Sequence, residues 1–245
     1  MNLKLTPIKL ILFDLDDTLF DFSACWEWAM KAAISAHPLT CDLDPDEFYR
    51  SLKHHSDALW PLILEKKVTF TEYRQLRLIK ASADFGLQVK AEMAETFQKL
   101  FLSKSMETIM PSPDVVSLLS QLADRYQLGI VTNGPADMAF EKIARLGFTH
   151  LFLSNTVFVS EIVGYHKPDR RIFQCALQQF GLRAEETIFV GDTWIADVVG
   201  AIDAGMKAVW YNPRKNESAT NHAPLAVIEK LDKLLDLLKS LPSTH

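Results

Sequence analysis

Hydrophobic and polar positions follow two different patterns along this chain. Residues 8–13 form a short apolar run rich in branched side chains that ends abruptly at Asp14. This pattern is typical of a buried parallel strand with polar chemistry at its carboxyl end. From about residue 21 to 105, apolar residues recur instead at spacings of three and four, which predicts amphipathic helices. We place these helices at 21–37, 44–67, 71–85 and 89–104.

After the Pro-Ser-Pro segment at 111–113, predicted helices and strands alternate. We expect strands at 128–131, within 151–159, at 187–190 and at 208–211, and helices at 113–126, 135–146, 169–180, 195–204 and 223–241. Repeated alternation predicts right-handed crossovers, and therefore a doubly wound, Rossmann-like parallel sheet of the α/β class. We expect one α/β core domain made of residues 1–19 and 106–245. An all-α domain, residues 20–105, is inserted after the first strand.

Composition and charge narrow the class of protein. The chain has 245 residues, of which 48% are hydrophobic and 23% are charged, as in ordinary globular proteins. A net charge of −5 argues against a nucleic-acid polymer as partner. No apolar stretch approaches the roughly 20 residues that span a membrane, and the first residues lack the pattern of a secretory signal. The odd number of cysteines, 3, favours a reducing compartment, so we expect a cytoplasmic protein without a membrane partner.

Polar residues stand at the carboxyl ends of the predicted strands, where doubly wound sheets bind their ligands. They are Asp14, Asp16, Thr18, Thr132, Asn133, Lys167, Asp192 and Asp197. The segment 14–17 holds three carboxylates, which either repel one another at the surface or surround a divalent cation. A calcium loop is excluded because Leu19 stands where that loop requires glycine. Asp192 can add another carboxylate and Lys167 a positive charge for phosphate oxygens, so the pattern favours Mg²⁺ and a phosphate ligand.

Four segments resemble, in the right order, the four motifs of the haloacid dehalogenase superfamily of hydrolases. They are DLDDTLF at 14–20, IVTNG at 130–134, HKPD at 166–169 and VGDTWIAD at 190–197. Longer stretches at 17–22, 159–173 and 200–213 are similar to bacterial members close to the pyrimidine 5′-nucleotidases. The resemblance covers both parts of the core. The helical insert resembles the cap domain of the family in position and character only.

The resemblance implies a role for each matching residue. Asp14 matches the nucleophile, which would form an aspartyl-phosphate and be a metal ligand. Asp16 matches the general acid and base, and its backbone carbonyl matches a metal ligand. Thr132 matches the hydroxyl that holds the phosphoryl group, together with the N–H group of Asn133.

Three further residues match the charged part of the same site. Lys167 matches the cation that balances the nucleophile and the phosphate. Asp192 matches a carboxylate ligand of the metal. Asp197 either binds the metal through water or orients Lys167, and the sequence leaves both roles open.

Asp16 separates the branches of the superfamily. The dehalogenase branch lacks an aspartate at this position, because a halide leaves without a proton whereas an alkoxide needs one. We therefore expect a Mg²⁺-dependent phosphatase for small phosphomonoesters, with nucleoside 5′-monophosphates first, acting as a monomer or homodimer. Two alternatives stay open: a sugar-phosphate mutase, and a non-catalytic regulator that binds a phosphate ligand.

Overall fold

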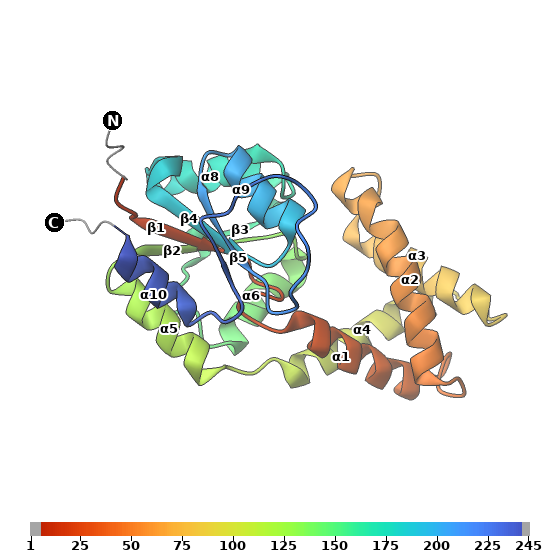
Figure 1. Ribbon diagram of the computed structural model, residues 1–245. Coiled ribbons are helices and arrows are strands. Elements are labelled where there is room, and N and C mark those ends of the chain that lie inside the picture. Colours follow the sequence, from red (N-terminus) through yellow and green to blue (C-terminus); the bar gives the residue numbers. More distant parts are fainter. Residues whose placement is uncertain (1–5, 242–245) are drawn as a thin grey trace. The chain divides into compact units, whose positions relative to one another are not determined.

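The computed structural model describes residues 6–241, and the chain divides into two compact units (Figure 1). The first, called the core unit, contains the described residues 6–21 and 111–241. The second, called the helical unit, runs from Phe22 to Met110. Within the described residues, no helix combines the length and the apolar character that crossing a membrane requires.

Six parallel strands form a single sheet in the core unit, in the order β3-β2-β1-β4-β5-β6. They are β1 (Leu10–Phe13), β2 (Gln127–Thr132), β3 (Val157–Val159), β4 (Thr187–Gly191), β5 (Lys207–Tyr211) and β6 (Ala226–Ile228). The chain adds β2 and β3 on one side of β1 and then returns to add β4 on the other side. The carboxyl ends of β1 and β4 therefore form the switch point at which such sheets bind ligands. The predicted doubly wound α/β fold is confirmed.

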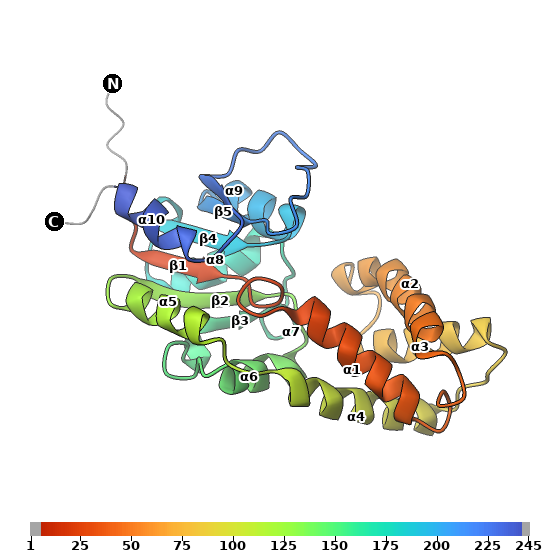
Figure 2. The same ribbon diagram turned by 60° about the horizontal axis from the view of Figure 1, so that its bottom comes forward.

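Helices cover both faces of this sheet. They are α5 (Pro113–Ala123), α6 (Ala136–Arg145), α7 (Ser160–Val163), α8 (Arg170–Phe180), α9 (Gly200–Asp203) and α10 (Lys233–Ser240). Short 3₁₀ turns occupy Ser154–Thr156 and Ala184–Glu186, and a π-helical segment, η3, occupies Trp194–Val199. Helices α8 and α9 lie on one face, while α5 and α10 lie on the other (Figure 2).

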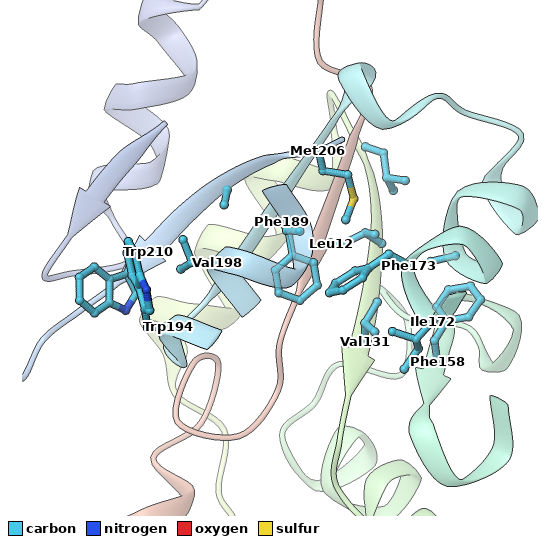
Figure 3. Close-up of a cluster of buried hydrophobic side chains, with 14 residues drawn as sticks. Leu12, Val131, Phe158, Ile172, Phe173, Phe189, Trp194, Val198, Met206 and Trp210 are labelled. Atoms are coloured by element: carbon cyan, nitrogen blue, oxygen red, sulfur yellow. The ribbon is translucent and has the colours of Figure 1, made fainter. Parts of the chain in front are cut away.

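Burial on both faces explains the apolar runs of the strands. All four residues of β1 are buried. On the face covered by α8 and α9, Leu12 and Phe189 pack with Phe173 (Figure 3). Trp194 and Trp210 close one end of this cluster, with ring centroids 4.6 Å apart. A strand enclosed in this way cannot alternate polar and apolar residues.

Two predicted helices of the core unit are wrong in part. The helix predicted at 223–241 is instead the strand β6 followed by the shorter helix α10. The apolar segment Ala226–Ile228 pairs with β5, because the edge of the sheet offers it backbone partners. The helix predicted at 195–204 begins as the π-helical segment η3, and only its second part is α-helical.

The helical unit contains α1 (Phe22–Ala36), α2 (Pro45–Leu64), α3 (Phe70–Asp84) and α4 (Ala91–Thr108), close to the four predicted helices. The side chain of Asp44 caps α2 by accepting from two backbone N–H groups. A capping box of Thr69 and Glu72 starts α3. Buried apolar residues, among them Phe48 and Phe97, form the interior of this unit.

Candidate active site

The carboxyl ends of three neighbouring strands carry polar side chains at one edge of the sheet. Asp14 follows β1, Thr132 ends β2, and Asp192 follows β4. Phe13, the last residue of β1, lies opposite both Ile130 and Val190 in the parallel register, so β2 and β4 extend two residues and one residue past the end of β1. The N–H group of Asp14 continues this pairing and donates to the carbonyl of Val190 at 2.9 Å.

Lys167 lies at the centre of the charged groups and is 2% exposed. Its ammonium donates to Oδ1 of Asp14 at 2.6 Å and to Oδ1 of Asp197 at 2.7 Å. The Asn133 side chain forms hydrogen bonds with both the backbone N–H group and the backbone carbonyl of Lys167. Asn133 accepts from the Lys167 N–H at 2.8 Å and donates to the Lys167 carbonyl at 2.9 Å. The loop after β2 thus fixes where this lysine stands.

Three carboxylates converge on this position. One oxygen from each of Asp14, Asp192 and Asp197 lies within 4.8 Å of the others. Burial raises the pKa of Asp14 well above its usual value, although the charge of Lys167 opposes the shift. Burial, together with the charges of Asp197 and Asp17, raises the pKa of Asp192 to about 7. A single ammonium therefore faces more negative charge than it neutralises, and these carboxylate oxygens suit a hard divalent cation.

Asp197 is the most constrained member of this group. Its Oδ1 accepts from Lys167, and its Oδ2 accepts from the backbone N–H of Thr193 at 2.8 Å. The residue lies on the π-helical segment η3, a type of helix often found at functional sites. A Cβ atom added to Gly191 would lie 2.5 Å from the Asp197 carboxyl carbon, so only glycine leaves room for this carboxylate.

Asp16 lies outside this group of three carboxylates, and its side chain has a different partner. Both of its oxygens accept from the ammonium of Lys142, at 2.7 and 2.9 Å. Lys142 is 1% exposed and lies on α6. Only Leu15 separates Asp16 from Asp14, and a turn then begins at Asp17, which lies in the left-handed region at a φ of 62°. The two aspartates therefore face different lysines.

Sequence reasoning missed Lys142, although the sequence carries a signal for it. Met138, Ala139 and Ile143 are buried on one face of α6, and the helical period places Lys142 on this same face. A lysine on the apolar face of a short amphipathic helix has to find a buried anion, because an unpaired buried ammonium is costly. That anion is Asp16.

Thr132 and Gly134 complete the edge of the site. The hydroxyl of Thr132 is buried and accepts from the N–H of Gly134 at 3.0 Å. A Cβ atom on Gly134 would lie 3.1 Å from Oδ2 of Asp16 and 3.2 Å from Oγ1 of Thr132. Gly134 thus lies close to the side chains of both Thr132 and Asp16. On the other side, Thr18 donates to Asp192 at 3.4 Å.

Comparisons with known proteins identify the family of this chain. A family model described as haloacid dehalogenase-like hydrolase matches residues 11–211. The chain is 32% identical to the glyceraldehyde 3-phosphate phosphatase of Methanopyrus kandleri over 242 residues, covering 96% of this chain and 98% of that protein. It is 29% identical to the pyrimidine 5′-nucleotidase PynA of Streptococcus pneumoniae over 232 residues, with 94% of each chain covered. The HAD-hydrolase YfnB of Bacillus subtilis, solved bound to magnesium, superposes with a TM-score of 0.82 at 26% identity, covering 96% of this chain and 100% of that one.

Proposed function

The chain belongs to the haloacid dehalogenase-like hydrolase family as an enzyme acting on phosphoric monoesters, and from this premise we propose a Mg²⁺-dependent phosphatase with an aspartyl-phosphate intermediate. The observation that carries this proposal is the contact of one buried lysine, Lys167, with both Asp14 and Asp197, beside the carboxylate of Asp192. A phosphoryl group needs such a site, in which positive charge faces a carboxylate nucleophile.

In the first half-reaction, a carboxylate oxygen of Asp14 attacks phosphorus while the bond from phosphorus to the ester oxygen breaks. The proton of the Asp16 carboxyl group passes to the leaving oxygen, so an alcohol departs instead of an alkoxide. In the second half-reaction, the Asp16 carboxylate takes a proton from water. The oxygen of that water bonds to phosphorus as the bond to Asp14 breaks, which releases inorganic phosphate.

The neighbouring residues hold the phosphoryl group and the charges around it. The Thr132 hydroxyl and the Asn133 N–H group bind phosphoryl oxygens, and the Lys167 ammonium balances their charge. The Asn133 side chain supports this role because it fixes the backbone of Lys167. Asp197 orients Lys167, since hydrogen bonds from Lys167 and Thr193 already engage both of its oxygens.

The carboxylates Asp14 and Asp192, with the backbone carbonyl of Asp16, are the residues that would hold Mg²⁺. Their donor set fits this hard cation, and burial, together with the charges of Asp197 and Asp17, raises the pKa of Asp192 in the absence of an ion. When bound, the ion supplies positive charge that shields the nucleophile from the anionic ester. The side chains described above position the ester and the reacting groups.

The substrate is a small phosphate ester, and we propose nucleoside 5′-monophosphates as the first class. This choice rests on the similarity to PynA, a pyrimidine 5′-nucleotidase. The similarity to glyceraldehyde 3-phosphate phosphatases makes triose phosphates the second class. We further propose that the helical unit acts as the cap that excludes water and selects the ester, and that the reaction takes place in the cytoplasm.

Hydrolysis by the purified protein tests the proposal. With Mg²⁺, we expect release of phosphate from p-nitrophenyl phosphate, and faster release from one member of a panel of nucleoside monophosphates, triose phosphates and hexose phosphates. Isomerisation of a hexose phosphate with little hydrolysis would identify the mutase alternative instead. Binding without turnover across the whole panel would favour the non-catalytic regulator.

A further inference from the structure

Lys142 is a buried charge that the proposed mechanism does not use. Its side chain is 1% exposed, on a helix face whose other members, Met138, Ala139 and Ile143, are apolar and buried. Desolvating an ammonium is costly unless the group is paired and hydrogen-bonded. Its pairing is bidentate, with 2.7 and 2.9 Å to the two oxygens of Asp16. The fold therefore places a full positive charge on one carboxyl group of the site.

The carboxyl group of Asp16 is confined from more than one side. Lys142 holds both oxygens, and Gly134 approaches so closely that a Cβ atom there would lie 3.1 Å from Oδ2. Glu161 accepts from the N–H of Ala136 at 2.8 Å and so ties the first turn of α6 to the segment after β3. The helix that carries Lys142 is thus anchored to the same sheet edge that carries the site.

We propose that Lys142 is the positioning residue for Asp16, just as Asp197 positions Lys167. This inference rests on the proposed function, in which Asp16 exchanges a proton with the leaving oxygen and with water. When the carboxyl group of Asp16 is ionised, Lys142 donates to both of its oxygens. When one oxygen carries the proton, Lys142 still holds the other oxygen, so the carboxyl group keeps its place through both half-reactions.

If Lys142 acts through the general acid, the loss of Lys142 should slow the hydrolysis of an ester more when its leaving group needs a proton. A nitrophenolate departs without needing a proton, whereas an alkoxide needs one. The matched pair of substrates is p-nitrophenyl phosphate and 4-nitrobenzyl phosphate, which are similar in size and differ in the basicity of the leaving oxygen. The parameter kcat/KM reports the first half-reaction, in which the alcohol leaves.

The variant Lys142→Met, compared with Arg145→Met on the exposed side of the same helix, tests this role. For Lys142→Met we expect kcat/KM to fall roughly 100-fold for the benzyl ester and less than about tenfold for the nitrophenyl ester. Lys142→Arg should recover part of the loss for the benzyl ester, because a guanidinium can also donate to both oxygens. Arg145→Met should leave both esters unchanged.

Two further measurements keep the test decisive. If Lys142→Met does not fold, as judged by its melting temperature, Lys142→Gln replaces it and must show the same dependence on the leaving group. In an Asp16→Asn background, Lys142→Gln should cause no further loss for the benzyl ester. Equal losses for both esters, or no loss for either, would overturn the inference. Inactivity of the unaltered protein toward all esters would overturn the proposed function, and this inference with it.

Discussion

The core unit and the helical unit bury charge in different ways. At the sheet edge of the core unit, Lys167 and Lys142 are buried and each is paired with carboxylates. In the helical unit, Arg77 is buried among aromatic rings, with its guanidinium carbon 5.2 Å from the centroid of Tyr73 and 5.8 Å from that of Trp26. Among the described residues, a group of carboxylates able to hold a metal is found only in the core unit.

This difference indicates what each unit is built for. Carboxylates gathered around too little positive charge reduce stability, and such groups are typical of functional sites. A cation enclosed by aromatic rings contributes favourable contacts and fits a packed interior. Substitutions at the sheet edge should therefore remove activity while sparing the fold. Substitutions inside the helical unit should do the reverse.

The largest expected effect is that of Asp14→Asn. It removes the proposed nucleophile, so kcat should fall at least about 1,000-fold. It also removes one of three mutually repelling carboxylates, so the melting temperature should stay equal or rise. Steady-state kinetics and thermal unfolding measure the two effects, with the exposed Asp124→Asn as control. Turnover near that of the unaltered protein would exclude Asp14 as the nucleophile.

The opposite behaviour is expected of Phe97→Ala. Phe97 is buried in the interior of the helical unit, and its truncation leaves a cavity. The free energy of unfolding should fall by about 3 kcal/mol, as measured by urea unfolding. At denaturant concentrations where the variant stays folded, kcat for p-nitrophenyl phosphate should stay within about threefold, since the proposed catalytic residues lie in the core unit. A loss of kcat as large as that of Asp14→Asn would contradict the separation of roles.

The pH dependence of the free energy of unfolding tests the buried charge of the core unit. The folded protein keeps a proton on Asp192 up to a pKa of about 7, whereas the unfolded chain loses it near the usual value. Between these two values the folded state binds more protons, so stability declines as the pH rises. In EDTA, the free energy of unfolding should fall by about 2 kcal/mol between pH 5 and pH 8.

Addition of Mg²⁺ should reverse this trend. Binding requires ionised carboxylates, so the ion should raise the melting temperature more at pH 8 than at pH 5. A thermal scan at the two pH values, with and without the ion, measures the difference. A free energy of unfolding that increases with pH in EDTA would show that the pKa of Asp192 is not raised in the folded protein.

The smallest expected effect is that of Gly191→Ala. The added methyl group would displace the Asp197 carboxylate and, through it, the ammonium of Lys167. We expect kcat/KM to fall about tenfold. The control is Gly181→Ala, at a φ of 64° with open space around it, which should cost about 1 kcal/mol of stability and leave kcat unchanged. Equal kcat/KM values for the two variants would contradict the role of Asp197 in orienting Lys167.

Much of the fold could be predicted from periodicity alone. The run ending at Asp14 predicted β1, and the spacing of apolar residues predicted α1 to α4 with small shifts at their ends. The prediction of one helix at 223–241 was wrong because apolar residues in the second half of this segment follow helical spacing. The first half contains a strand of three residues, β6, which forms by pairing with its neighbour β5. The π-helical segment η3 was also not predicted, because the spacing of apolar residues does not reveal which backbone groups are hydrogen-bonded.

The residues of the candidate site could be named from the sequence because each lies within a recognisable motif. The sequence by itself determined the α/β class, the helical insert and the residue types at the strand ends. Only the tertiary structure decided the pairing: Lys167 with Asp14 and Asp197, and Lys142 with Asp16. Local sequence sets backbone preference and periodicity, whereas the partner of a buried charge is chosen by groups far away in the chain, which meet only after the sheet has formed.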